Sequence, residues 1–118
     1  MKKILVVDDA MFMRLSLKTL LGKNGFEVVG EADNGKKAIE MYQRLKPDIV
    51  TMDITMPEME GIEAVEQIIQ IDPKATIVMV SAMGQEDKIK RAIMKGARGF
   101  IVKPFNEDKL VKTMKQFS

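Results

Sequence analysis

Short apolar runs rich in β-branched residues recur along the chain at nearly even spacing. They occupy residues 4–7, 27–30, 49–52, 76–80 and 99–102, and their starts lie 23, 22, 27 and 23 residues apart. Runs of this length, bounded by turn residues, are typical of buried β-strands. The pattern therefore predicts five strands separated by intervals long enough to hold a helix.

The segments between these runs carry apolar residues at helical spacing. The five stripes are Phe12, Leu15, Leu20 and Leu21; Ala38, Met41, Tyr42 and Leu45; Ile62, Val65 and Ile69; Ile89, Ala92 and Ile93; and Leu110, Met114 and Phe117. Stop signals follow the first four stripes, at Asn24-Gly25, Pro47, Asp72-Pro73 and Gly96. We expect a helix in each of these segments.

Strand and helix alternate five times, which predicts an α/β fold with a doubly wound parallel sheet. Right-handed crossovers place helices on both faces, so the expected architecture is a three-layer sandwich. The runs at 4–7, 49–52 and 76–80 are largely apolar on consecutive residues, as expected for strands buried on both faces. The run at 27–30 is flanked by Glu27 and Glu31, which favours an edge strand. We expect a single domain over residues 1–118.

Polar residues follow four of the predicted strands. Asp8 and Asp9 follow the first, Asp53 the third, Ser81 the fourth and Lys103 the fifth. In a parallel sheet these strand ends lie along one edge, where open α/β sheets bind their ligands. The sequence thus predicts three carboxylates, a hydroxyl and an ammonium group in one place.

This set of groups suits phosphoryl chemistry. Three carboxylates repel one another unless a cation lies among them, and oxygen ligands favour a hard ion such as Mg²⁺. One carboxylate can then attack phosphorus, while the metal, the lysine and the hydroxyl stabilise the phosphoryl oxygens. We interpret the edge as a site that forms and holds an aspartyl phosphate.

At these residues the sequence resembles the receiver domain of two-component response regulators, and within that family the stand-alone chemotaxis receivers. The likeness covers essentially the whole chain. It rests on Val6-Val7-Asp8-Asp9, residues 52–57 (MDITMP), Gly61, Ser81-Ala82 and Val102-Lys103-Pro104-Phe105. The resemblance implies a flavodoxin-like (βα)5 fold with strand order 2-1-3-4-5.

The resemblance also implies roles at the metal site. Asp53 is the expected phosphoacceptor. Asp9 and Asp53 are expected to bind Mg²⁺ directly, together with the backbone carbonyl of Thr55, while Asp8 acts through a water molecule. Mn²⁺ or another divalent ion is expected to substitute for Mg²⁺.

Further roles follow from the same resemblance. Lys103 is expected to pair with Asp53 and then with the phosphoryl group, and the Lys103–Pro104 bond is expected to be cis. Ser81 is expected to hydrogen-bond a phosphoryl oxygen and draw the loop 82–85 inward, while Phe100 serves as the switch aromatic. The side chains of Thr55 and Met83 are expected to flank the attacking water and so to alter the phosphoryl lifetime.

Composition narrows the function classes. The 118 residues include no cysteine or histidine, which excludes disulfides, thiolate zinc sites and a phosphohistidine on this chain. The net charge of +2 and an aromatic content of 5% give no indication of nucleic-acid binding. No apolar run approaches the roughly 18 residues of a membrane helix. We expect a cytoplasmic monomer that binds neither nucleic acid nor membrane.

Charge is distributed unevenly along the chain. Residues 1–84 hold 10 basic and 13 acidic side chains, whereas residues 85–118 hold 9 and 4. A basic surface for an acidic partner is one interpretation, and a solvated helix face is the other. The candidate partner face consists of Lys88, Ile89, Phe100, Lys109 and Lys112.

The resemblance implies a chemotaxis-type histidine kinase as donor, a flagellar motor switch protein as output and a phosphatase as a further partner. We expect a phosphoacceptor switch rather than an enzyme.

Other functions use a similar fold or a similar set of residues. A phosphorelay intermediate, which passes the phosphoryl group to a histidine phosphotransfer protein, has the same fold and site. Its partner surface would centre on the first predicted helix and the loops of the site, where Met11, Phe12 and Met13 give apolar character. A phosphatase of the haloacid dehalogenase type needs a second aspartate two residues after the nucleophile, where this chain has Thr55. A flavodoxin needs a phosphate-binding first loop, which Asp8 and Asp9 would repel. The eleven methionines suit adaptable packing better than a copper site.

Overall fold

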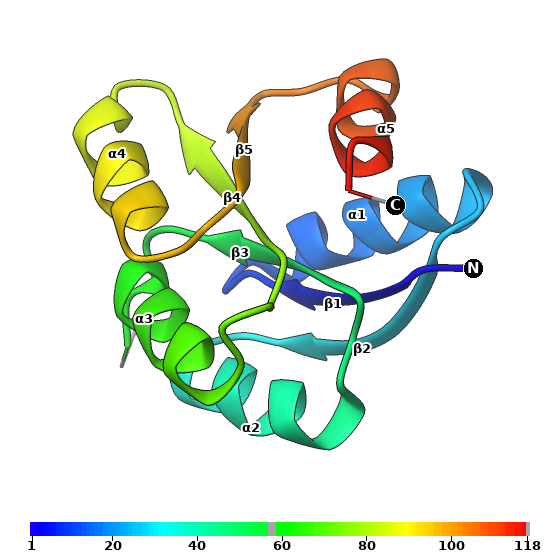
Figure 1. Ribbon diagram of the computed structural model, residues 1–118. Helices are drawn as coiled ribbons and strands as arrows, with labels where there is room; N and C mark the ends of the chain where they lie inside the picture. Colours follow the sequence, from blue (N-terminus) through cyan, green and yellow to red (C-terminus); the bar gives the residue numbers. More distant parts are fainter. Residues whose placement is uncertain (57–58, 118) are drawn as a thin grey trace.

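The computed structural model describes residues 1–56 and 59–117, so Pro57 of the 52–57 motif lies outside the described residues. The described chain contains a parallel sheet in the order β2-β1-β3-β4-β5 (Figure 1). Its strands are β1 (Lys3–Val7), β2 (Glu27–Ala32), β3 (Ile49–Asp53), β4 (Ile77–Ala82) and β5 (Gly99–Lys103). The predicted fold class and strand order are confirmed.

Helices cover both faces of the sheet. They are α1 (Met11–Lys23), α2 (Gly35–Leu45), α3 (Gly61–Ile71), α4 (Glu86–Met94) and α5 (Glu107–Lys115). Helices α1 and α5 lie on one face and α2 and α3 on the other, with α4 beside α3 (Figure 1). The sandwich therefore has the three layers that the alternation of strands and helices predicts.

Each face of the sheet has its own apolar core. Along β4, Ile77 and Met79 belong to the cluster under α2, α3 and α4, whereas Val78 and Val80 belong to the cluster under α1 and α5. Successive side chains of a strand point to opposite faces, so a doubly covered strand is apolar at every position. Strand β2 lies at the edge, and most of its side chains are only partly buried.

The strands extend further toward the site than the apolar runs indicate. Strand β3 ends at Asp53, which pairs with Val80, and β4 ends at Ala82, which pairs with Lys103. Backbone pairing does not depend on side-chain polarity, so the ladder continues through polar residues. The polar groups of the site are thus held on regular strand backbone or one or two residues beyond it.

The buried face of α1 agrees only in part with the predicted stripe, of which Leu21 is buried and Leu20 is partly buried. Leu17 and Leu21 are buried, whereas Phe12 and Leu15 are 80% and 60% exposed. Apolar residues surround much of this helix, so spacing alone allows more than one face to be chosen. In α4, Ile93 of the predicted stripe is also exposed. The other three stripes are buried or partly buried and pack against the two cores.

Gly61 brings the start of α3 against the backbone of the predicted phosphoacceptor. Its N–H donates to the carbonyl of Ile54 at 2.8 Å. A Cβ atom at this position would overlap the carbonyl oxygen of Asp53. Since backbone cannot move aside as a flexible side chain can, the close approach of helix and strand end requires glycine here.

We expect Gly61→Ala to lower the free energy of unfolding by about 1–3 kcal/mol, because the added methyl group overpacks the contact with Asp53. Gly22→Ala in α1 is the matched control. A Cβ atom there meets nothing within 4 Å, and alanine in a helix gains about 0.5–1 kcal/mol over glycine. Urea denaturation of both variants measures the two signs. Equal effects in the two variants would contradict the proposed steric role of Gly61.

Candidate functional site

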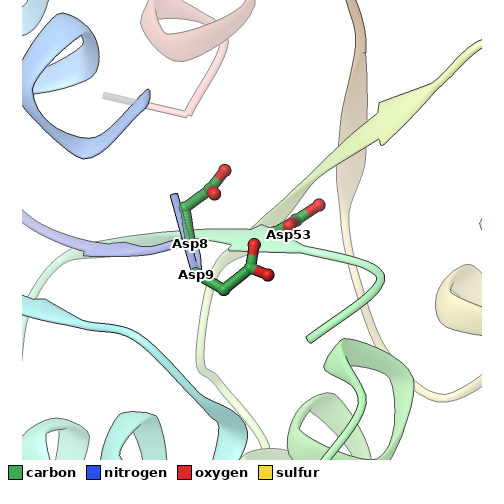
Figure 2. Close-up of side chains that lie close together, drawn as sticks. All are labelled: Asp8, Asp9 and Asp53. Atoms are coloured by element: carbon green, nitrogen blue, oxygen red, sulfur yellow. The ribbon is translucent and has the colours of Figure 1, made fainter. Parts of the chain in front are cut away.

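Three carboxylates converge where β1 and β3 end (Figure 2). Asp8 and Asp9 directly follow β1, and Asp53 is the last residue of β3. One carboxylate oxygen from each residue lies within 4.8 Å of the others. Asp8 and Asp53 are 1% and 8% exposed, whereas Asp9 is exposed to solvent. Neighbouring strands β1 and β3 therefore bring together residues that are more than forty positions apart in sequence.

Lys103 at the end of β5 reaches this cluster. Its Nζ donates a hydrogen bond to Asp8 Oδ2 at 3.3 Å and forms an ion pair with Asp53 Oδ1 at 3.6 Å. The peptide bond between Lys103 and Pro104 is cis. The ammonium group thus lies close to two buried carboxylates and offsets part of their mutual repulsion.

The backbone and carboxylate of Asp8 are held by several hydrogen bonds. Its N–H donates to the carbonyl of Ala32, and its Oδ1 accepts from the N–H of Ala10 at 2.9 Å. Its carbonyl accepts from Arg14 Nη1 at 2.8 Å. With Oδ2 bonded to Lys103, both carboxylate oxygens already have donors. This arrangement suits a carboxylate that contacts a cation through water.

Arg14 is a site residue that the sequence pattern did not reveal. Its Nε donates to Glu31 Oε1 on the edge strand at 3.0 Å while Nη1 holds Asp8. The hydrogen bond from Lys18 to Glu31, together with the contact from Arg14, holds the pKa of Glu31 below its usual range. The glutamate thereby remains ionised and keeps the guanidinium in place. An arginine in the first turn of a helix gives no such signal in sequence.

The environment of Asp53 favours its protonated form. Burial and the nearby carboxylates of Asp8 and Asp9 raise the pKa of Asp53 to about 6, although the Lys103 ammonium acts in the opposite direction. The carboxyl group is still largely ionised at neutral pH. A cation among the three carboxylates would favour the ionised form further.

Ser81 lies in β4 next to Val80, the residue that pairs with Asp53. Its side chain is fully buried, and its hydroxyl has no hydrogen-bond partner among the described residues. The hydroxyl of Thr51, in β3, is in the same situation. A buried hydroxyl without a partner is unfavourable, so Ser81 can gain stability from an acceptor brought to this edge.

The donor set fits a hard divalent cation. All three acidic residues offer oxygen atoms, and their carboxylates lie close enough to share one ion. Thiolate and imidazole ligands are absent from the chain, which contains no cysteine or histidine. Mg²⁺, which retains several waters and takes a few carboxylates, matches this set better than ions that prefer nitrogen or sulfur.

A second side chain not expected from sequence, Gln85, connects the loops that flank Asp53. Its Oε1 accepts from the N–H of Ala82 at 2.7 Å, and its Nε2 donates to the hydroxyl of Thr55 at 3.2 Å. Thr55 is exposed and follows β3 by two residues. The loop after β3 and the loop after β4 are therefore linked by one carboxamide.

An apolar groove lies beside this edge, between α4 and β5. It has a volume of about 740 Å³ and is lined by Met83, Ile89, Ile93, Met94, Phe100 and neighbouring residues. Of the candidate partner face, Phe100 is 49% exposed in this groove and Ile89 is nearly buried in it. Lys88 lies on α4, and Lys109 and Lys112 are exposed on α5.

The sequence matches the family described as response regulator receiver domain over residues 4–115. The chain belongs to this family. It is 55% identical over 117 residues to chemotaxis protein CheY of Thermotoga maritima, covering 99% of this chain and 98% of that protein. It is also 56% identical over 112 residues to chemotaxis protein CheY of Bacillus subtilis, covering 95% and 93%.

Solved structures agree with this assignment. CheY in a CheX-CheY-BeF3-Mg²⁺ complex from Borrelia burgdorferi matches with a TM-score of 0.93 and 36% identity, over 98% of this chain and 87% of that chain. CheY4 of Vibrio cholerae matches with a TM-score of 0.91 and 31% identity, over 100% and 99%. The receiver is a CheY-like response regulator, and its chemotaxis relatives favour a chemotaxis role over the phosphorelay alternative.

Within the described part of the receiver, no helix combines the length and the apolar character that a membrane span requires.

We expect Asp53 to make the metal-free receiver progressively less stable as the pH rises from about 4 to about 6. Asp53 has a raised pKa in the folded state, so folded protein binds the proton more tightly than unfolded protein over this range. The effect amounts to about 2 kcal/mol. Each pH unit is worth about 1.4 kcal/mol at most, and the slope is smaller near the folded and unfolded pKa values, where Asp53 is only partly protonated.

Asp53→Asn is the matched control, because asparagine does not titrate. Urea unfolding in EDTA at several pH values gives the difference in stability between variant and wild type. That difference should grow in favour of Asp53→Asn between pH 4 and pH 6. A constant difference would contradict the raised pKa of Asp53.

Proposed function

We propose that this receiver is a phosphorylation switch in which Asp53 accepts a phosphoryl group with the aid of Mg²⁺. The observation that carries the proposal is the position of the Asp53 carboxylate. It lies beside the carboxylates of Asp8 and Asp9 and 3.6 Å from the Lys103 ammonium, at the ligand-binding edge of the sheet. We propose further that residues 1–118 act as one domain and signal by binding other proteins.

Asp9, Asp53 and the backbone carbonyl of Thr55 would hold the cation directly, and Asp8 would act through water. Bound Mg²⁺, or Mn²⁺ in its place, supplies positive charge that stabilises the phosphoryl oxygens. The crowding of the three carboxylates supports this role, because their repulsion falls when a cation is shared. The family relative that was crystallised with Mg²⁺ supports the choice of metal.

In the transfer step, an ionised Asp53 oxygen forms a bond to phosphorus. The bond from phosphorus to the donor breaks, and its electron pair leaves with the donor group, which is an imidazole when the donor is a phosphohistidine. Lys103 keeps its proton and stabilises charge on the phosphoryl oxygens. Hydrolysis returns the carboxylate when water attacks the same phosphorus, so the receiver contributes to both its phosphorylation and its dephosphorylation.

The change would be communicated through Ser81 and Phe100. The buried hydroxyl of Ser81 would donate to a phosphoryl oxygen, which moves the loop 82–85 that follows it. Phe100 pairs with Met79 in β4 and is half exposed beside that loop, so it has room to move inward. Met83, also in the loop, is apolar and exposed, and together with Thr55 it would influence the lifetime of the acyl phosphate.

Incubation with a small-molecule phosphodonor and Mg²⁺ should add the mass of one phosphoryl group to the intact wild-type protein. The adduct should be absent in EDTA, because the carboxylates and phosphoryl oxygens then repel one another, and absent in Asp53→Asn. Intact-mass spectrometry at several time points measures both. An equal adduct on Asp53→Asn would place the acceptor elsewhere, and no adduct on wild type would contradict the proposal.

We propose a chemotaxis-type histidine kinase as the donor, a flagellar motor switch protein as the output and a phosphatase as a further partner. The receiver would act as a monomer through α4, β5 and α5. Exposed Lys109 and Lys112 on α5, with Lys88 on α4, give this face positive charge beside the apolar groove that contains Ile89 and Phe100.

Reversing two charges at once, Lys109→Glu with Lys112→Glu, should weaken binding of the phosphorylated receiver to the motor switch protein of the same organism by about tenfold. Phosphorylation itself should not change, since both lysines lie outside the carboxylate cluster. Fluorescence anisotropy with labelled receiver measures the affinity. The matched control is Lys36→Glu with Lys37→Glu on α2, which should have little effect; equal losses in both pairs would remove α5 from the docking face.

A further inference from the structure

Gln85 makes contacts that join two separate loops at the site. It immediately precedes α4 and is followed by Glu86, the first residue of that helix. Its side chain bonds the N–H of Ala82, one residue after the buried Ser81, and the hydroxyl of Thr55, two residues after Asp53. The carboxamide therefore connects the end of β4 with the chain just after β3.

The direction of the carboxamide follows from its partners. A backbone N–H can only donate, so the oxygen of Gln85 must face Ala82, and its nitrogen is left to donate to Thr55. Gly84 has a φ of +87°, which lets the loop fold back so that Gln85 can reach Ala82. The hydrogen bonds to Ala82 and Thr55 and the positive φ of Gly84 thus all favour one resting conformation of the loop 82–85.

The Gln85 side chain makes these contacts instead of capping α4. The residue occupies the N-cap position of α4, yet its side chain makes no capping hydrogen bond. Residues at the same position of α2 and α5, Asn34 and Asn106, cap their helices in the usual way. The Gln85 side chain therefore bonds residues of two loops instead of the first turn of its own helix, so its role lies in tertiary contacts.

We propose that Gln85 is a positioning residue that holds the loop 82–85 in its resting place and opposes its movement toward a phosphoryl group. The inference rests on the proposed function of Asp53. The Ser81 hydroxyl has no partner at rest, so a new acceptor on Asp53 would draw it. Because Ala82 is covalently attached to Ser81, that movement strains the hydrogen bond from the Ala82 N–H to Gln85 Oε1. The Nε2 atom of the same carboxamide is bonded to the Thr55 hydroxyl, which keeps Gln85 from following.

The two hydrogen bonds of Gln85 thereby set how readily the loop leaves its resting position. A ligand that favours the moved loop must overcome them, which lowers its apparent affinity. The Gln85 contact uses the Thr55 side chain and leaves the Thr55 carbonyl available. Removing the contact should therefore change the affinity for the phosphoryl group more than the affinity for Mg²⁺.

The test is a titration with beryllofluoride, a stable phosphoryl mimic, in excess Mg²⁺. Isothermal titration calorimetry measures its affinity for each variant. Gln85→Ala should bind it about three- to tenfold more tightly than wild type, as expected for the loss of one or two weak hydrogen bonds. Mg²⁺ alone, titrated in the same way, should bind with an affinity within about twofold of wild type. Thr55→Val, which removes the outer anchor, should shift the beryllofluoride affinity in the same direction by a smaller factor.

The two hydrogen bonds of Gln85, to Ala82 and to Thr55, are called the latch below. Two further variants separate the effect of the latch from general effects on the loop. Gln85→Glu keeps an oxygen acceptor for Ala82 and should show no gain in affinity. Gln70→Ala replaces an exposed glutamine of α3 and should match wild type. Unchanged or weaker beryllofluoride binding by Gln85→Ala overturns the proposal, as does an equal gain in Gln85→Glu.

The wild-type titration distinguishes failure of the latch from failure of the proposed function. Wild-type protein that binds beryllofluoride while Gln85→Ala binds no better retains the phosphoacceptor function and loses only the latch. Wild-type protein that does not bind beryllofluoride overturns both. Thermal melting confirms that each variant is folded before it is titrated.

Discussion

Repulsion among three carboxylates is the constraint on which the site depends. Asp8 and Asp53 are buried, Asp9 lies beside them, and Lys103 offsets part of their charge. Such a cluster costs folding free energy, as the raised pKa of Asp53 shows. The fold tolerates it because the doubly covered sheet supplies two apolar cores beneath the edge. The same unfavourable charge would be relieved by a shared cation, which in the proposed switch would help to hold the phosphoryl group.

Much of the fold and the heart of the site could be predicted from the sequence. Apolar runs at even spacing predict the five strands, and the geometry of a parallel sheet is sufficient to place Asp8, Asp53, Ser81 and Lys103 along one edge. These inferences succeed because they depend on the order and direction of the strands, which a shift of one or two residues in a strand end does not change. The strand order came from resemblance to a family, since spacing alone allows several orders.

Other features depend on packing that no local pattern encodes. The buried side of α1 is set by Leu17 and Leu21, although Phe12 and Leu15 are equally apolar, because the helix is apolar around much of its circumference. Arg14 and Gln85 acquire their roles from partners 17 and 30 residues away. Their side chains are ordinary surface types, so three-dimensional contact is the only signal that distinguishes them.

The cis Lys103–Pro104 junction and the Lys103 side chain come at the end of the last strand, whereas Asp8 comes at the end of the first. The proposed acceptor, Asp53, is therefore made about fifty residues before the lysine that completes its surroundings. During synthesis on the ribosome, a shortened or unfinished chain contains Asp53 without its ammonium partner. The proposed acceptor site is therefore complete only after β5 has been made and has paired with β4.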